Sequence, residues 1–368
     1  MSLSTGIVGL PNVGKSTLFN TLTNSNALAA NYRFATVEPN IGIINLPDLR
    51  LEKLKEIYQS EKIIPAAFKF VDIAGLIEGA SKGEGLGNKF LQNIRDTNAI
   101  CHVVRCFADK NITHEYTTVD SIRDIEIINL ELIISDLDIV EKRIQKIVKK
   151  AQSGDKESTS ELAILNKAKS LLEQNKLVKF ENWNDKEFKY LNELNLITIK
   201  PMLYVANIDE EHISNPNNNQ EYLRILEYVK NTNDLVIPIS IKIEHEINQL
   251  DNETKKEIMK DLDIEYTGLE NLVRESFKLL NLSTYFTCGK QEIHAWVFRN
   301  GMLAPECAGI IHTDFEKGFI KAEVISYEDL IKFDNEVIAK ENGKMRLEGK
   351  TYQMKDGDIC NFKFNVTK

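Results

Sequence analysis

The sequence has few of the residues that build disulfides, structural metal centres and membrane spans. Its five cysteines are odd in number and form no Cys-x-x-Cys pair, so we expect a reducing compartment, with neither disulfides nor structural zinc. No apolar run approaches the roughly 20 residues that a membrane-spanning helix needs, so we expect no contact with a membrane. Residues 1–5 lead directly into the first predicted strand. They leave no room for a signal or transit peptide, and we therefore expect a cytoplasmic protein.

A strong charge of either sign is also missing from most of the chain. The net charge is −9, and residues 201–282 hold most of the acidic excess, with 8 Lys and Arg against 16 Asp and Glu. Residues 1–121, 122–200 and 283–368 are close to neutral. The acidic total therefore does not exclude local contact between these three segments and a polyanion such as nucleic acid.

What the chain does contain is a phosphate-binding loop. Residues 9–16 match G-x-x-x-x-G-K-[ST], between a predicted strand at 5–10 and a predicted helix at 16–28. Backbone N–H groups of such a loop converge on phosphate oxygens, and the helix N-terminus adds positive potential. Lys15 is expected to reach the β- and γ-phosphates as a catalytic residue, and Ser16 to bind Mg²⁺. The four fixed positions disfavour the alternative, a glycine turn without a ligand. The residues predicted to contact phosphate are Asn12, Val13, Gly14, Lys15, Ser16 and Thr17.

Two later segments are typical of nucleotide-dependent switches. Thr36 lies in a polar, turn-rich segment after the first helix, where a switch protein places a Mg²⁺ ligand. The D-x-x-G motif from Asp72 to Gly75 ends a predicted buried strand, so Asp72 is expected near Mg²⁺ and the Gly75 N–H near the γ-phosphate. Four glycines in residues 76–87 leave the backbone without one preferred conformation. That composition suits a segment that becomes ordered when nucleotide binds.

Alternating strand and helix patterns predict an α/β fold interrupted by a helical hairpin. Further buried strands are predicted at residues 66–73, 101–107, 202–206 and 235–240. From about residue 122 the pattern becomes helical, with a narrow apolar stripe of coiled-coil type. Its members in the first helix are Ile127, Leu130, Ile134, Leu137, Ile144 and Val148. Gly154 and Asp155 break the pattern before it resumes, so we predict an antiparallel hairpin.

Basic residues cluster near the end of the hairpin's first helix. They are Lys142, Arg143, Lys146, Lys149 and Lys150. Two explanations stay open, a solvated face that complements the helix dipole and a face that binds a polyanion. Beyond residue 283, short strands and turns predict a small α+β unit. In that unit Lys317 and Lys321 are candidate phosphate contacts, whereas Phe315 and Phe319 are expected in the core.

These stretches together resemble the YchF or Obg-like ATPase family, a branch of the Obg-related translation-factor GTPases. The resemblance is carried by residues 6–19, 34–40, 70–79, 83–87, 102–107, 311–320 and 355–358. It implies a Ras-like P-loop NTPase domain over residues 1–121 and 201–282. It also implies an inserted helical hairpin (coiled coil) over 122–200 and a C-terminal β-grasp TGS domain over 283–368. Arg33 stands where family members commonly have proline, and Ala35 where some have cysteine.

The base-reading segment departs from the GTPase pattern N-K-x-D, whose aspartate accepts hydrogen bonds from guanine. Ile208 and Glu210 take the lysine and aspartate positions, and Asp209 stands one place early, where it could substitute. Losing a charge-assisted bidentate contact costs about 2–4 kcal/mol, so these residue types favour ATP over GTP. The resemblance implies that Asn207 and the backbone near Ile208 read adenine. Ser240 begins the second segment in which a GTPase would read the base.

The chain lacks the glutamine with which Ras-like proteins orient the attacking water, because Leu76 follows D-x-x-G. Hydrolysis therefore needs another positioning group or will be slow. The family resemblance places a histidine at His114, which we take as the candidate. K⁺ is a second candidate, since Asn12 stands where potassium-dependent relatives place an asparagine ligand and K⁺ could supply positive charge.

We therefore expect a monomeric, nucleotide-dependent switch that binds and hydrolyses ATP with Mg²⁺, and GTP more weakly. The resemblance supplies the ribosome as partner, contacted through the hairpin and the TGS segment. Two other classes of function stay open. One is a metabolic phosphotransferase that uses the same loop, and the other is a non-catalytic or GTP-preferring adaptor that acts through the TGS domain.

Overall fold

The computed structural model describes residues 3–24, 40–73, 86–109, 118–251, 254–255, 257 and 266–365. The predictions for Thr36, Gly75, Leu76 and His114 lie outside these ranges. The chain divides into two compact units, one of residues 1–42 and 69–272 and the other of residues 43–68 and 273–368. None of the described helices is long and apolar enough to cross a membrane.

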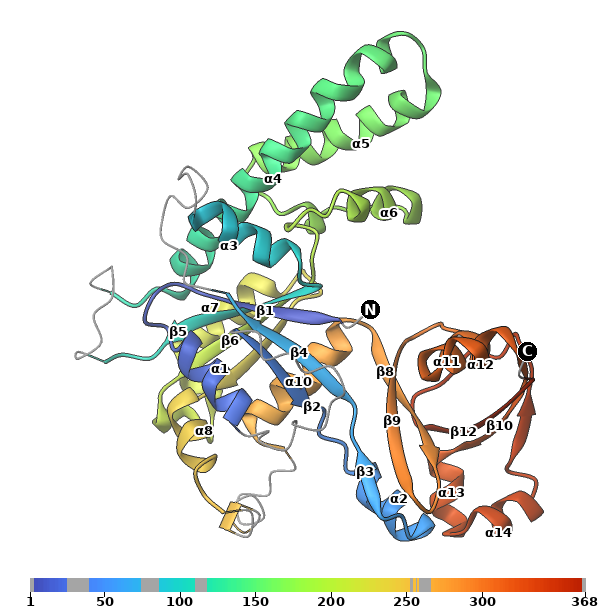
Figure 1. The fold of residues 1–368 in the computed structure, drawn as a ribbon. Coiled ribbons are helices and arrows are strands. Elements are labelled where there is room, and N and C mark those ends of the chain that lie inside the picture. Colours follow the sequence, from blue (N-terminus) through green and yellow to red (C-terminus); the bar gives the residue numbers. More distant parts are fainter. Residues whose placement is uncertain are drawn as a thin grey trace. The chain divides into compact units, whose positions relative to one another are not determined.

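The first unit is built on a six-stranded sheet with the order β2-β4-β1-β5-β6-β7 (Figure 1). The pairs from β4 to β7 are parallel. Every residue of β1, β5 and β6 is buried, as expected for the centre of a parallel sheet that is covered on both faces. The strands are β1 (Ser4–Val8), β2 (Ile41–Asn45), β4 (Ala67–Asp72), β5 (Ala99–Cys106), β6 (Met202–Ile208) and β7 (Leu235–Ile239). Each lies within two residues of its predicted position where one was predicted.

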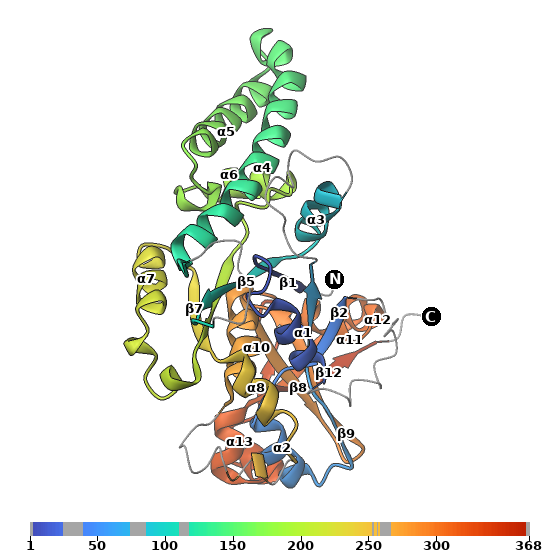
Figure 2. The ribbon, with the colours of Figure 1, turned by 90° about the vertical axis from the view of Figure 1, so that its left-hand side faces the viewer.

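Besides the helices of the insert, four described helices of this unit connect the strands or lie against them, and a fifth, α10, begins in this unit and ends in the second (Figure 2). Helix α1 packs against β1 and α8, and α7 packs against β6 and β7. They are α1 (Lys15–Asn24), α3 (Leu86–Arg95), α7 (Gln220–Val229), α8 (Ile241–Ile247) and α10 (Gly268–Leu279). Because α1 and α8 follow β1 and β7, their N-termini lie at the carboxyl edge of the parallel strands, where ligands bind in open α/β sheets.

The predicted hairpin is confirmed as α4 (Ser121–Gln152) and α5 (Lys156–Glu173), which pack together and are followed by α6 (Asp185–Glu193). The side chains of Asp120 and Asp155 accept backbone N–H bonds at the N-termini of α4 and α5, which stabilises both helix ends.

The predicted buried face of α4 is wrong. Leu130 of the predicted stripe is 44% exposed, whereas Asp136 is completely buried. Asp136 accepts from Thr198 N at 2.7 Å and pairs with Arg95 Nη1 at 2.8 Å. The buried face therefore contains polar residues whose partners lie far away in sequence, and an apolar periodicity does not reveal them.

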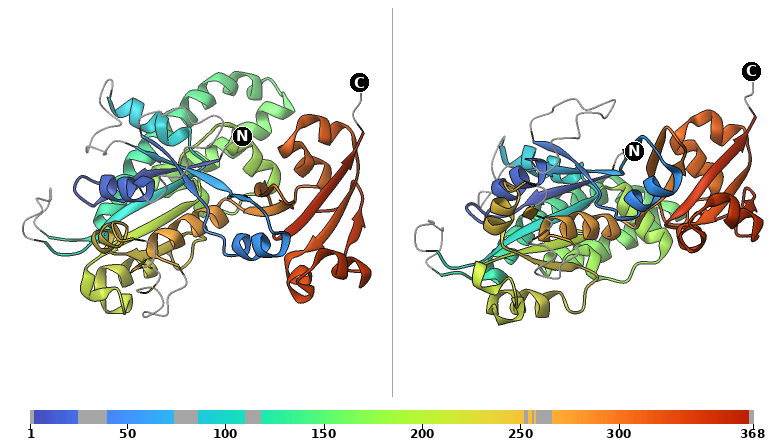
Figure 3. Two further views of the ribbon diagram at one scale, coloured as in Figure 1. Left: turned by 60° about the horizontal axis from the view of Figure 1, so that its bottom comes forward. Right: turned by 90° about the horizontal axis from the view of Figure 1, so that it is seen from below.

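The second unit is a mixed six-stranded sheet with the order β11-β10-β12-β8-β9-β3. Its C-terminal strands are the red arrows of Figure 3. Its strands are β3 (Lys62–Ile64), β8 (Leu282–Cys288), β9 (Glu292–Arg299), β10 (Phe319–Ser326), β11 (Arg346–Glu348) and β12 (Asp358–Phe364). Its helices are α2 (Arg50–Tyr58), α11 (Ala304–Ile311), α12 (Thr313–Lys317), α13 (Tyr327–Phe333) and α14 (Glu336–Glu341). Phe319 belongs to the core and Phe315 packs against it, as predicted.

Residues 43–68 contribute β3 and α2 to this second unit. Arg50 anchors them, because its guanidinium pairs with Asp48 at 2.7 Å and Asp356 at 2.8 Å and donates to Thr284 Oγ1 at 3.0 Å. The predicted limits of the three domains stay a prediction, and they place residues 43–68 with the first domain.

Candidate nucleotide-binding site

The phosphate loop leaves β1 at Val8 and enters α1 at Lys15, which is the strand–loop–helix setting that the motif requires. Gly14 has a φ of 98°. A Cβ added to Gly14 would lie 2.8 Å from Asn207 Nδ2, and one added to Gly9 would lie 2.7 Å from the Val103 carbonyl oxygen. Glycine is therefore required at both positions, because no other residue leaves room for these close approaches.

The structure brings Lys15 of this loop and Asp72 of the D-x-x-G motif together. Lys15 is 8% exposed, and its Nζ lies 2.8 Å from Asp72 Oδ1 at the end of β4. Ser16 and Thr17, in the first turn of α1, are exposed. Of the three predicted Mg²⁺ ligands, Asp72 is therefore one member of this ion pair, and Ser16 directly follows the other member, Lys15, in the chain. The third, Thr36, and the predicted γ-phosphate contact Gly75 lie outside the described residues.

The donor chemistry at this end of the site fits Mg²⁺. The hydroxyl of Ser16 and the carboxylate of Asp72 are hard oxygen ligands, which Mg²⁺ prefers, and this ion usually completes its shell with phosphate and water oxygens. Among the described residues, no group of three or more His, Cys, Asp or Glu side chains is placed to hold a metal. Asn12, the candidate K⁺ ligand, has a φ of 62° in the same loop.

A pocket of about 520 Å³ opens beside the phosphate loop. Its walls come from that loop, from residues 107–109 after β5, from residues 207–210 after β6, and from the start of α8. The carboxyl ends of three neighbouring parallel strands thus supply one continuous wall, as in other open α/β sheets. Of the predicted base-contacting residues, Asn207, Ile208, Glu210 and Ser240 all line this pocket.

The side chain of Asn207 links the wall of the pocket to the phosphate loop by hydrogen bonds. It is 6% exposed, its Nδ2 donates to the Val13 carbonyl at 3.0 Å, and its Oδ1 accepts from Ile241 N at 3.2 Å. Ile208, 3% exposed, ends β6, and Ser240, 5% exposed, immediately precedes α8. Asn207 therefore ties the loop to the N-terminus of α8, and its reading of the base stays a prediction.

Two of the three acidic residues that follow β6 lie near a lysine or a histidine. Glu210 Oε1 accepts a hydrogen bond from Lys242 Nζ, and these side chains are 46% and 71% exposed. Asp209 lies with its Oδ2 3.5 Å from His212 Nδ1. Glu210, in the position of the guanine-reading aspartate, is therefore engaged by a lysine at the rim of the pocket.

One residue that shapes the pocket, Arg105 of β5, was missed by the sequence analysis. It is 3% exposed, donates to the carbonyls of Phe107 at 3.1 Å and Asp109 at 3.0 Å, and lies 4.7 Å from the centre of the Phe107 ring. The guanidinium thereby fixes the wall formed by residues 107–109. An arginine within a predicted buried strand was the available signal, because arginine is seldom fully buried without a specific set of partners.

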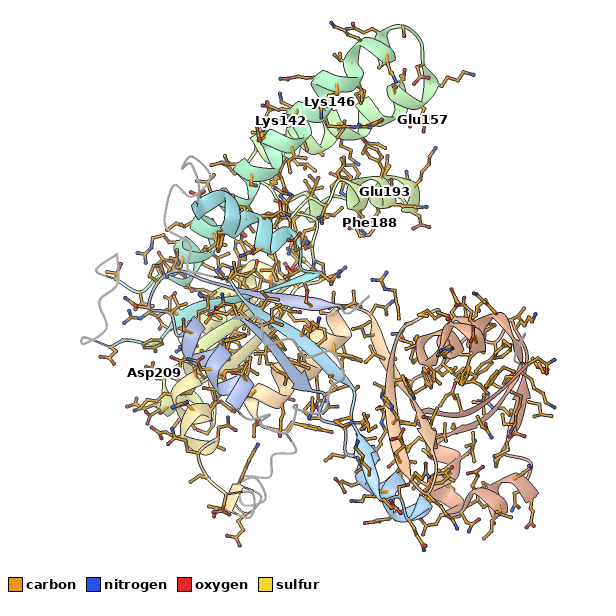
Figure 4. The ribbon with its side chains drawn as sticks, in the orientation of Figure 1. Lys142, Lys146, Glu157, Phe188, Glu193 and Asp209 are labelled. Atoms are coloured by element: carbon orange, nitrogen blue, oxygen red, sulfur yellow. The ribbon has the colours of Figure 1, made fainter. Side chains whose placement is uncertain are left out.

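The basic cluster of the hairpin is only partly available to a ligand. Arg143 Nε lies 2.5 Å from Glu161 Oε1, which also accepts from the Tyr190 hydroxyl. Arg143 therefore joins α4, α5 and α6 and has a structural role. Lys142 pairs with Asp138 at 2.6 Å, and Lys142 and Lys146 project from α4 (Figure 4). Lys146, Lys149 and Lys150 are exposed, and no described carboxylate pairs with them.

The fold and the site define a P-loop nucleotide-binding protein of the G-domain class, with an inserted hairpin and a C-terminal β unit. Comparison with known families agrees. Residues 4–167 match the model MMR_HSR1, described as a 50S ribosome-binding GTPase. Residues 282–365 match YchF-GTPase_C, described as a protein of unknown function (DUF933).

Whole-chain comparisons are more specific. The chain is 52% identical over 366 residues to the ribosome-binding ATPase YchF of Bacillus subtilis, covering 100% of both chains. It is 48% identical over 367 residues to the protein of the same name in Escherichia coli O157:H7, again covering 100% of both. The solved YchF GTPase of Schizosaccharomyces pombe superposes with a TM-score of 0.89 at 37% identity, covering 98% of each chain. The chain belongs to the YchF family, which confirms the resemblance and the predicted fold class.

Proposed function

We propose that this protein is a nucleotide-dependent switch that hydrolyses ATP and associates with the ribosome. The base end of the pocket carries the proposal. Ile208 replaces the lysine that packs along guanine, and the Glu210 carboxylate pairs with Lys242. A carboxylate whose charge is already shared with a lysine is a weaker acceptor for guanine's N1–H and 2-amino groups. The bacterial relatives bear the name ribosome-binding ATPase, which supports the same choice of nucleotide.

At the phosphate end, the Lys15–Asp72 pair rearranges in the proposed reaction. Lys15 turns to the β- and γ-phosphates, where its charge stabilises the transferred phosphoryl group. Asp72, Ser16 and Thr36 are the residues that would hold Mg²⁺, which neutralises phosphate charge when bound. His114 and K⁺ stay our candidates for orienting water and for supplying additional charge.

The relatives' names also supply the proposed partner. Lys146, Lys149 and Lys150 of α4 are exposed, and lysines of this kind bind phosphate backbones without reading sequence. We propose that this face of the hairpin contacts the ribosome, which would place the protein in the cytoplasm. A monomer remains our expectation for its oligomeric state.

A titration and a turnover assay together test the proposal. We expect ATP to bind more tightly than GTP, and we expect slow phosphate release from ATP that ribosomes accelerate. GTP binding at least tenfold tighter than ATP would contradict the nucleotide choice. Phosphate release that stays at the buffer rate with and without ribosomes would favour the non-catalytic adaptor. Phosphate transfer to a small-molecule acceptor in preference to water would instead favour the phosphotransferase.

A further inference from the structure

We propose that Lys242 shifts the choice between adenine and guanine nucleotides, because it binds Glu210 Oε1 and weakens a carboxylate that would otherwise accept stronger hydrogen bonds from guanine. This inference rests on the proposed function, since it concerns the same pocket. It assigns the selectivity to a pair of residues rather than to Glu210 alone.

The first observation is the distribution of charge around the pocket. Its lining includes the carboxylates of Asp109, Asp209, Glu210 and Glu246, and Lys242 is the only lysine or arginine among the lining residues described. The Glu210 hydrogen bond, with the charges of Glu210, Glu246 and Asp109, raises the pKa of Lys242. The ammonium therefore stays charged at neutral pH and remains available to Glu210.

The second observation is that the other polar groups after β6 have different contacts. The side-chain amide of Asn207 bonds to Val13 and Ile241 within the protein. The Asp209 carboxylate lies beside His212. Glu210 is consequently the carboxylate of this segment that lies next to Lys242, which belongs to the first turn of α8.

Guanine and adenine should respond differently to this contact, because they present different hydrogen-bonding groups to the Glu210 carboxylate. Guanine presents N1–H and 2-amino donors on its Watson–Crick edge, which a free carboxylate accepts as charge-assisted hydrogen bonds. Adenine presents an N1 acceptor at the corresponding position, so a free carboxylate repels it. With Lys242 bound to Glu210 Oε1, this carboxylate is a weaker acceptor for guanine and presents less negative charge to adenine.

The pair is exposed, and exposed ion pairs are weak. Its role is therefore to occupy the carboxylate and does not depend on stabilising the fold. Replacing Lys242 with an uncharged side chain of similar length releases a carboxylate whose hydrogen bond to guanine is worth about tenfold in affinity. The same change should leave the folded state intact, because 71% of the Lys242 side chain is already exposed.

The test is a set of nucleotide titrations with the full chain. Equilibrium dissociation constants for ATP and GTP are measured for the parent, Lys242→Met, Glu210→Gln and the double variant. We expect Lys242→Met to lower the ratio Kd(GTP)/Kd(ATP) about tenfold. Glu210→Gln alone should change this ratio by less than about twofold, since the carboxylate is already occupied, and the double variant should return it to the parent value.

A matched control removes an equally exposed lysine from another glutamate. Lys230, which directly follows α7, pairs with Glu227 at 3.2 Å, with 64% and 74% of their side chains exposed, and neither lines the pocket. Lys230→Met should leave the ratio unchanged.

Three results are decisive. An unchanged ratio in Lys242→Met would overturn the inference, and so would a lowered ratio that persists in the double variant, because the effect would then not pass through Glu210. If the parent itself prefers GTP and Lys242→Met still lowers the ratio tenfold, the inference stands and the proposed preference for ATP fails. The two proposals therefore fail by different results.

Discussion

The phosphate end and the base end of the candidate site are built in different ways. The phosphate end is a run of consecutive residues, 9–16, whose geometry follows from two glycines and a helix N-terminus. The base end is assembled from three loops after β5, β6 and β7 and is held by contacts between residues distant in sequence. Asn207 joins the two ends through Val13. A short motif is thus sufficient to specify phosphate binding, whereas selectivity for the base depends on tertiary contacts.

We expect the largest loss of ATP binding from a substitution where the phosphate loop approaches Asn207 of the base end. At Gly14 we expect Gly14→Ala to weaken ATP binding by at least about thirtyfold. The new methyl would lie 2.8 Å from Asn207 Nδ2, and a non-glycine residue at a φ of 98° costs about 1–3 kcal/mol. Measurement of the ATP dissociation constant by titration checks this expectation.

Gly154 is the matched control for this prediction. It has a φ of 90°, but nothing lies within 4 Å of a Cβ added there. Gly154→Ala should therefore lower the melting temperature by a similar backbone strain while leaving ATP binding unchanged. If the two variants bound ATP equally well, the close approach of Gly14 to Asn207 would not matter for the site.

A smaller effect, confined to the base end, is expected from Arg105→Lys. Lysine cannot reach the Phe107 and Asp109 carbonyls together or present a planar group to the Phe107 ring. The wall of residues 107–109 should therefore loosen, raising KM for ATP about tenfold with kcat nearly unchanged, because the phosphate end is untouched. Steady-state phosphate release at a series of ATP concentrations measures both constants.

Arg95→Lys serves as the comparison for Arg105→Lys. Arg95 is also buried and also donates to a backbone carbonyl, that of Asn195 at 2.9 Å, but this partner does not line the pocket, whereas the Arg105 partners do. It should lower stability without moving KM. A kcat that falls in Arg105→Lys while KM stays constant would show that Arg105 does not act through the base wall.

These differences also explain how much could be predicted from the sequence. The phosphate loop, the order of strands and the hairpin are local patterns of glycine and apolar spacing, and the structure confirms them. The buried face of α4 was predicted wrongly because Asp136 is satisfied by Arg95 and Thr198, which lie about 40 and 60 residues away. Arg105 was missed for the same physical reason, since its contacts become visible only when the loop after β5 is placed.

Residues 43–68 illustrate a third kind of difficulty. Residues 46–66 of this segment lie between β2 and β4 of the first sheet, yet the whole segment belongs to the second compact unit. This assignment rests on the pairing of β3 with β9 and on the Arg50 contacts with Asp356 and Thr284, all of which join residues more than 200 positions apart in the sequence. No periodicity or motif within the segment carries that information.

We expect the smallest effect from the exposed lysines of α4, which belong to neither the phosphate end nor the base end of the site. Changing Lys146, Lys149 and Lys150 together to Ala should weaken ribosome co-sedimentation about fivefold near physiological salt. It should also flatten the salt dependence by roughly one unit of slope for each phosphate group that a lysine no longer neutralises. Basal ATP turnover should stay constant, because none of the three lines the pocket. Arg143 is left unchanged in this variant, since its pairing with Glu161 joins three helices.

The control changes three other exposed lysines of the insert, Lys176, Lys186 and Lys189, to Ala. Equally weakened co-sedimentation in both triple variants would mean that only total charge matters, and unchanged co-sedimentation in both would leave the α4 face as a solvated helix surface.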